Sequence, residues 1–233
     1  MENTNENIDE IFRKIADDIV KDRDKKDKAN VKINYASCPD IIVGEDGVFW
    51  FSKNERKNHI EKLKIENIDK AKNKKHIVIV LESPHKDEYE DKNFINPALG
   101  KTGRMLQEFF TDYNLKKLFG KEYLKNGYQV ILINSIQYQC SLGESPEIYR
   151  DKVWRKMWDN NIVKKKFKER VISYCADIII NLCTKSNEKP EERKGSVQTA
   201  IEEVKKNADK NIILYEGNHP SSWASNFDSI SLI

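Results

Sequence analysis

The sequence predicts an α/β protein in which a central, mostly parallel sheet of four strands lies between two layers of helices. Three observations predict this fold. The aliphatic runs at 77–81 and 129–134 have the length and composition of strands that are buried on both faces. Segments with helical spacing of apolar residues alternate with such runs. The chain of 233 residues can form one large core, and it has no apolar run of the roughly 18 residues that span a bilayer.

Residues 1–70 are expected to form an extension, and residues 71–233 the main α/β domain. Apolar residues at helical spacing predict a helix over 8–20, which ends in the charged run "KDRDKKDK". The segments "VKIN" (31–34) and "GVFWF" (47–51) are expected to be short strands, and "GEDG" between them a turn. The extension would thus consist of one helix and a small β element, with the hairpin at the margin of the sheet.

Strands and helices are expected to alternate through the main domain. The strands are predicted at 77–81, 129–134, 177–182 and 211–215, and the helices at 102–111, within 147–173 and at 196–206. This alternation is typical of βαβ units, whose strands run parallel. The residues that follow these strands would therefore lie along one edge of the sheet, where ligands bind in α/β proteins.

Composition limits the expected partners and location. The formal net charge of +3 is nearly balanced, so affinity for nucleic acid would require a local basic patch. The N-terminal "MENTNENIDE" is acidic, unlike a secretory signal, and together with the lack of a spanning segment it predicts a cytoplasmic protein with no membrane partner. We also expect a monomer.

Polar residues follow all four predicted strands. The first strand leads into "LESPH", the second ends in Asn134, the third leads into "NLCTKS" and the fourth into "YEGNHPSSW". Each segment alone is equally typical of an ordinary polar loop. Because all four would meet at the same edge of the sheet, together they favour a ligand site.

Several of these segments resemble motifs of the uracil-DNA glycosylase superfamily. "LESPH" resembles its first motif, a proline-containing polar loop after a strand, "VILIN" the strand that delivers a base-reading asparagine, and "HPSS" the H-P-S motif of the last loop. "DKNFINPALGKTGRML" resembles the stretch that carries a base-stacking aromatic residue. The resemblance covers about residues 76–225. It implies a DNA glycosylase that flips uracil or a modified or deaminated pyrimidine out of duplex or single-stranded DNA and excises it.

The resemblance implies a base pocket made of four residues. Phe94 would be the surface on which the base stacks, unless it is a core residue at a helix entrance. Asn134 would read the pyrimidine edge, because its amide both donates and accepts hydrogen bonds; the simpler interpretation is a turn residue. Ser83 and His85 would form other walls, with His85 at the position of a tyrosine that excludes a 5-methyl group. Uracil is therefore not fixed as the base.

Catalytic roles are implied for His219 and for at least one carboxylate. His219 would donate a hydrogen bond to O2 of the departing base anion, unless it is an exposed loop residue. Glu82 stands where the iron–sulfur branch of the superfamily has a glutamate, and Asp87 and Glu88 follow closely. A carboxylate here would stabilise the cationic sugar or orient the attacking water. Because Ser83 replaces the water-activating aspartate of the best-known branch, the identity of the acting group stays open.

Three residues of the last loop would contact DNA. Ser221 and Ser222 would bind a phosphate beside the target nucleotide. Trp223 would be a wedge that fills the gap left by the flipped nucleotide, in which case its side chain should be exposed in the free protein. The alternative is a core residue that anchors the C-terminal segment.

Two other functions compete with the glycosylase. Ser83 in place of the aspartate keeps open a module that binds nucleotides or DNA without cleaving them. The "PD" at 39–40 followed by "FWFSK" resembles a metal-dependent nuclease pattern, but Phe51 stands where a metal-binding carboxylate should be. No cofactor is expected, because only Cys38 precedes the first motif, whereas the iron–sulfur branch has a close pair of cysteines there. No metal-binding residues are assigned.

Overall fold

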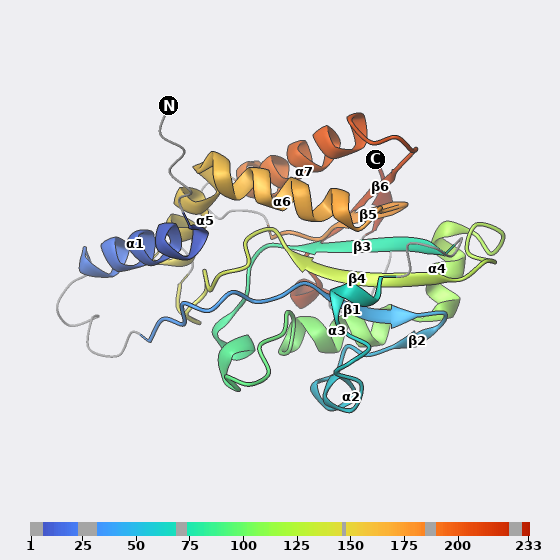
Figure 1. Ribbon diagram of the computed structural model, residues 1–233, viewed down its shortest axis with the longest axis horizontal. Helices are drawn as coiled ribbons and strands as arrows, with labels where there is room; N and C mark the ends of the chain where they lie inside the picture. Colours follow the sequence, from blue (N-terminus) through green and yellow to red (C-terminus); the bar gives the residue numbers. More distant parts are fainter. Residues whose placement is uncertain (1–6, 23–31, 69–73, 146–147, 185–189, 224–229) are drawn as a thin grey trace.

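Seven strands form one mixed sheet in the computed structural model of the chain (Figure 1). The structure describes residues 7–22, 32–68, 74–145, 148–184, 190–223 and 230–233, without the side chains of residues 190–193. The order across the sheet is β2-β1-β4-β3-β5-β6-β7. The strands are β1 (Ile41–Glu45), β2 (Val48–Phe49), β3 (Lys75–Leu81), β4 (Tyr128–Asn134), β5 (Ile178–Asn181), β6 (Ile213–Glu216) and β7 (Ser231–Leu232).

The centre of the sheet is parallel, as the sequence predicts. β3 pairs with β4 and β5, and β5 pairs with β6, all in the parallel direction. Every residue of β4 is buried, and so are the last six residues of β3, because helices cover both faces. The prediction of four strands was incomplete, since the antiparallel strands β1, β2 and β7 extend the same sheet at its two edges.

A hairpin does lie at the margin of the sheet, but its first strand was wrongly placed. β1 pairs with β2 and with β4, and the turn contains Asp46 and Gly47, whose φ angles of 48° and 92° suit a tight hairpin turn. Residues 32–34 of the predicted strand "VKIN" are not in a strand, and residue 31 lies outside the described ranges. The backbone N–H of Asn34 donates to the side chain of Gln139 at 2.7 Å and not to a strand.

Helices cover both faces of the sheet, with α6 and α7 on one face and α3 and α4 on the other, while α5 lies next to α1 and α6 (Figure 1). The α-helices are α1 (Ile8–Lys21), α2 (Lys53–Asn58), α3 (Lys101–Phe109), α4 (Asp112–Phe119), α5 (Arg150–Asp159), α6 (Asn161–Ser173) and α7 (Pro190–Lys206), and the one-turn 3-10 helices are η1 (Ile65–Asn67), η2 (Lys86–Tyr89) and η3 (Pro220–Ser222). The short helices α2 and α4 were not predicted. None of the helices within the described ranges is both long and apolar enough to cross a membrane.

A buried ion pair joins α6 to the residue before β1, and its arginine also holds the end of β4. Both carboxylate oxygens of Asp40 accept hydrogen bonds from Nη1 of Arg170, at 2.7 and 2.6 Å, and Tyr174 donates its hydroxyl to the same carboxylate. Nη2 of Arg170 donates to the backbone oxygens of Asn134 at 2.9 Å and Ser135 at 3.2 Å. Asp40, the aspartate of the nuclease-like pattern, therefore supports the sheet edge.

We expect Asp40→Ala to lower the free energy of unfolding by about 3–5 kcal/mol, because it leaves a largely buried guanidinium without its counter-ion. Urea denaturation followed by circular dichroism measures this loss. The matched control is Glu61→Ala, which removes the partner of Lys64 from an exposed pair, and its denaturation midpoint should stay near that of the unaltered protein. Equal midpoints for the two variants would contradict the anchoring role of Asp40.

Candidate functional site

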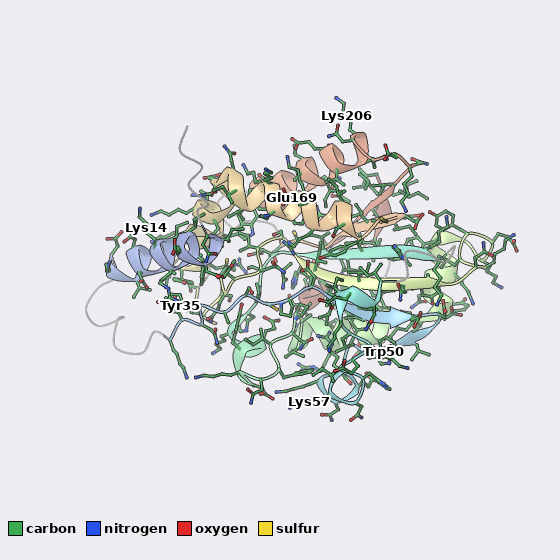
Figure 2. The ribbon with its side chains drawn as sticks, viewed as in Figure 1. Lys14, Tyr35, Trp50, Lys57, Glu169 and Lys206 are labelled. Carbon is green, nitrogen blue, oxygen red and sulfur yellow. The ribbon has the colours of Figure 1, made fainter. Side chains whose placement is uncertain are left out.

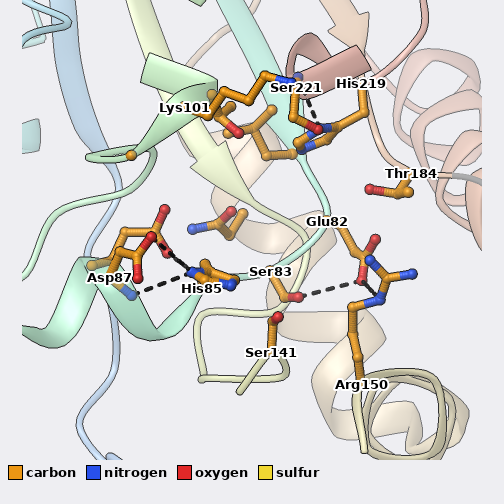
Figure 3. Close-up of a pocket in the computed structure, with 15 residues that line it drawn as sticks. Glu82, Ser83, His85, Asp87, Lys101, Ser141, Arg150, Thr184, His219 and Ser221 are labelled. Atoms are coloured by element: carbon orange, nitrogen blue, oxygen red, sulfur yellow. Dashed lines mark hydrogen bonds and ion pairs between the residues drawn. The ribbon is translucent and has the colours of Figure 1, made fainter. Parts of the chain in front are cut away.

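A cavity of about 300 Å³ lies at the carboxyl ends of the parallel strands (Figure 3). It gathers residues from the segments that follow β3, β4, β5 and β6, so the predicted polar ends do converge. The predicted site residues that line it are Glu82, Ser83, His85, Asp87, Asn134, His219 and Ser221, and Glu88 lines it as well. Phe94, Ser222 and Trp223 are not among its lining residues.

The register of β3 and β4 brings Glu82 and Asn134 together. Leu81 pairs with Asn134, so the residues after both strands begin at the same level. The hydroxyl of Ser135 donates to the backbone oxygen of Glu82 at 2.5 Å, and the N–H of Ile136 donates to the same oxygen at 3.1 Å. These bonds fix the backbone on both sides of the cavity floor. Glu82 and Asn134 are consequently buried, with 3% and 2% of their surface exposed.

The carboxylate of Glu82 lies between a cation and a hydroxyl, as Figure 3 shows. Nε of Arg150, at the start of α5, is 3.7 Å from Oε1 of Glu82, and the hydroxyl of Ser83 donates to that oxygen at 3.5 Å. The same Nε is 3.1 Å from the carboxylate of Asp151. Arg150 thus offsets the charge of a buried carboxylate at the cavity wall.

His219 is held as a neutral imidazole. The backbone N–H of Ser221 donates to its Nδ1 at 3.3 Å, and the hydroxyl of Ser221 is 2.8 Å from the same nitrogen. Because Nδ1 accepts, the single proton of the neutral ring lies on Nε2, which leaves Nε2–H as a donor. The ring keeps some contact with the cavity but is otherwise surrounded by protein, and this burial lowers the pKa of His219 to about 4. Glu82 opposes this shift and Arg150 adds to it.

The loop after Ser83 is held by its own acidic residues. The carboxyl group of Glu88 accepts hydrogen bonds from the N–H of His85 and, at 3.0 Å, from the N–H of Ala98. Burial raises the pKa of Glu88 to about 8. Oδ2 of Asp87, whose side chain is half exposed, is 3.2 Å from Nδ1 of His85. Glu88 therefore has a structural task in this loop, whereas Glu82 and Asp87 present carboxylates to the cavity.

The structure does not place Phe94 at the cavity. Its side chain is 5% exposed, and the ammonium group of Lys57 lies 5.4 Å from the centre of its ring. None of the described Phe, Tyr or Trp residues lines the cavity. The flat rings that do line it are the imidazoles of His85 and His219, so the core interpretation of Phe94 fits its position.

Trp223 does not have the exposure that a wedge requires. It is 5% exposed and packs against Phe109 and Phe110, with ring centres 5.1 and 6.5 Å away. Its indole N–H donates to the backbone oxygen of Asn218 at 2.9 Å. Ser222 is exposed, and its hydroxyl donates to the backbone oxygen of His219 at 2.7 Å. Trp223 is thus a core residue that positions the loop of His219.

The sequence did not indicate five of the polar lining residues, namely Lys101, Thr102, Ser141, Arg150 and Thr184. Thr184 belongs to a segment that was recognised as polar but given no role. Lys101 follows Gly100 at the start of α3, which the sequence did signal as a helix start. Nothing in the sequence connects Arg150 with Glu82. Within the described ranges, no three His, Cys, Asp or Glu side chains are grouped as metal ligands would be.

We expect the imidazole of His219 to stay neutral, with its proton on Nε2, from pH 8 down to about pH 5. Nitrogen-15 NMR of the imidazole rings measures this state, and His219→Asn assigns the signals. Because the pKa is about 4 when folded and 6.5 ordinarily, the unfolded chain binds the proton first, and His219 lowers stability as pH falls from about 6.5 to 4. Protonation near pH 6.5 in the folded protein would contradict the burial argument.

The cavity thus combines a carboxylate beside an arginine, a neutral imidazole donor and a buried amide, all within one edge of the sheet. Comparison of the chain with protein-family models, with curated proteins and with solved structures finds no match.

Proposed function

We propose that the protein is a DNA glycosylase, which flips out uracil or a modified or deaminated pyrimidine and hydrolyses its N-glycosidic bond. The observation that carries this proposal is the state of His219, a neutral ring with Nε2–H as donor in the cavity that also holds Glu82 and Asn134. A pyrimidine leaves its sugar as an anion, and a fixed donor near its O2 lowers the barrier by electrostatic stabilisation.

The base would be held by the buried amide and an imidazole. A cavity of about 300 Å³ is at the small end of ligand sites, which fits a single flipped base better than a larger ligand. Asn134 offers a donor and an acceptor to the edge of the base. With Phe94 buried elsewhere, the imidazole of His85 is the flat surface available for stacking at the mouth of the cavity.

The cavity has one group for each of the two charges that develop during the reaction. As the bond between C1′ and the base nitrogen breaks, its electron pair leaves with the base, and His219 stabilises the anion. Glu82 stabilises the positive charge that develops on the sugar. Asp87 orients the water whose hydroxyl bonds to C1′, while the remaining proton of that water neutralises the base. Arg150 is a positioning residue, because it contacts Glu82.

A binding module without cleavage is the second candidate, and the state of the carboxylates favours it. Glu82 lies beside Arg150, Asp87 beside His85, and Glu88 holds the loop backbone. If these interactions persist with DNA bound, none of the three carboxylates activates water. The same cavity would then recognise a flipped base without excising it.

A panel of labelled oligonucleotides with uracil, hypoxanthine, xanthine or modified cytosines tests the reaction. After incubation with EDTA present, heating in alkali cuts the strand at abasic sites. We expect cleavage of at least one pyrimidine substrate, since no proposed step uses a metal. Binding of the panel without any abasic product would support the binding module, and cleavage abolished by EDTA would support the nuclease.

Substitutions separate the roles of His219 and Glu82 in single-turnover kinetics. We expect His219→Asn to slow excision by about 10²–10³-fold with nearly unchanged affinity for DNA, because its contact strengthens only as the base becomes anionic. Glu82→Gln should also slow excision and spare affinity. His59→Asn, outside the cavity, is the matched control and should keep the normal rate. Normal rates for both site variants would refute the assignment.

A further inference from the structure

A second cavity, of about 580 Å³, shares two walls with the first. In the turn at η2, His85 and Asp87 line the first cavity and Lys86 and Tyr89 the second. Successive Cα atoms are only about 3.8 Å apart, so the two cavities lie on either side of one turn of chain. The second shared wall is the segment 139–141, whose ends line the second and first cavities respectively.

The second cavity is cationic. It is lined by Lys32, Lys86 and Lys92, with Glu90 as its single acidic residue. Among the described residues none of these three lysines forms an ion pair, so their ammonium groups remain available to a ligand. Such unpaired lysines around a hollow are suited to phosphate groups.

The end of the Lys86 side chain packs against the backbone of Gly143. A Cβ atom there would lie 2.7 Å from Cε and 2.9 Å from Nζ of Lys86, closer than atoms can approach. Gly143 also has a φ of 78°, which other residues adopt with strain. The side chain of Lys86 therefore lies against the backbone just after the segment 139–141.

Tyr35 supplies a fixed aromatic ring to the second cavity. Its hydroxyl donates to the carboxylate of Asp17 at 2.5 Å, and the guanidinium of Arg13 lies 4.3 Å from the centre of the ring. Both partners belong to α1, and Figure 2 shows Tyr35 beside that helix. The neighbouring Asn34 is bonded to Gln139. Arg13 covers one face of this half-buried ring, so a base would stack on the opposite face.

We propose that the second cavity binds unpaired DNA that flanks the target nucleotide. The lysines contact the phosphates, and one base stacks on Tyr35. This inference rests on the proposed function, because the strand is the one whose target base enters the first cavity. Stacking on Tyr35 needs a base without a partner, so the structure assigns the protein a preference for single-stranded DNA over duplex.

Fluorescence polarisation with an undamaged, labelled oligothymidylate tests the lysines without any excision. We expect the triple variant Lys32→Glu, Lys86→Glu and Lys92→Glu to bind at least about tenfold more weakly. The slope of the logarithm of the binding constant against the logarithm of the salt concentration should fall in magnitude by about 2, since each lost phosphate contact with a single strand removes about 0.7 from it. The matched control reverses Lys117, Lys121 and Lys125, exposed lysines outside both cavities, with the same change in net charge. Equal effects of both triples would overturn the inference.

Substitution of Tyr35 tests the stacking separately. Tyr35→Ala should weaken binding of oligothymidylate by about tenfold, whereas Tyr35→Phe, which keeps the ring and its contact with Arg13 but loses the bond to Asp17, should weaken it much less. Neither should change binding of a strand of abasic spacers. Melting midpoints check that the alanine variant stays folded, and the lysine triple provides an independent test if it does not.

The outcomes separate this inference from the proposed function. Weaker binding of oligothymidylate by the lysine triple variant, together with no excision across the oligonucleotide panel, would support DNA binding in the second cavity and reject the glycosylase. Normal excision with affinities unchanged in the lysine triple and in Tyr35→Ala would reject the second cavity and keep the glycosylase. A duplex bound as tightly as the single strand would also overturn the inference.

Discussion

The site depends on the in-register parallel pairing of β3 and β4, which ends at Leu81 and Asn134. Because both strands stop at the same level, the next residues leave the sheet side by side, and Ser135 can bond to the backbone of Glu82. A shift of one residue would turn Asn134 to the opposite face. Arg170 holds the end of β4 from the helical layer. The position of the carboxylate and amide is therefore a property of the sheet, not of flexible loops.

The cavity holds a carboxylate paired with an arginine and, separately from that pair, a neutral donor. Burial governs the state of His219, since the neighbouring Glu82 and Arg150 act on its pKa in opposite directions. The imidazole and the carboxylate therefore line the cavity as two separate groups. Such separation suits a reaction in which positive and negative charge develop at the same time on different parts of one substrate.

The parts predicted from sequence are those that local pattern determines. Buried aliphatic runs predicted the four parallel strands. Because parallel strands all end at the same edge of a sheet, Glu82, Asn134 and His219 were expected to share that edge. Tertiary packing decided the rest. Nothing local distinguishes a core Trp223 from an exposed one, because its environment comes from Phe109 and Phe110, at the end of α3 and far away in the sequence.

The same limit explains the strand that was misplaced and the cation that was missed. "VKIN" has strand-like composition, but the apolar run from Ile41 pairs with β4, while Asn34 bonds to Gln139. Arg150 meets Glu82 only because α5 begins beside the cavity.

The outermost strands of the sheet affect how the protein behaves at high concentration. β2 and β7 contain two residues each, so the margins of the sheet expose few unpaired backbone groups, and these strands give another chain little to add to by edge-to-edge aggregation.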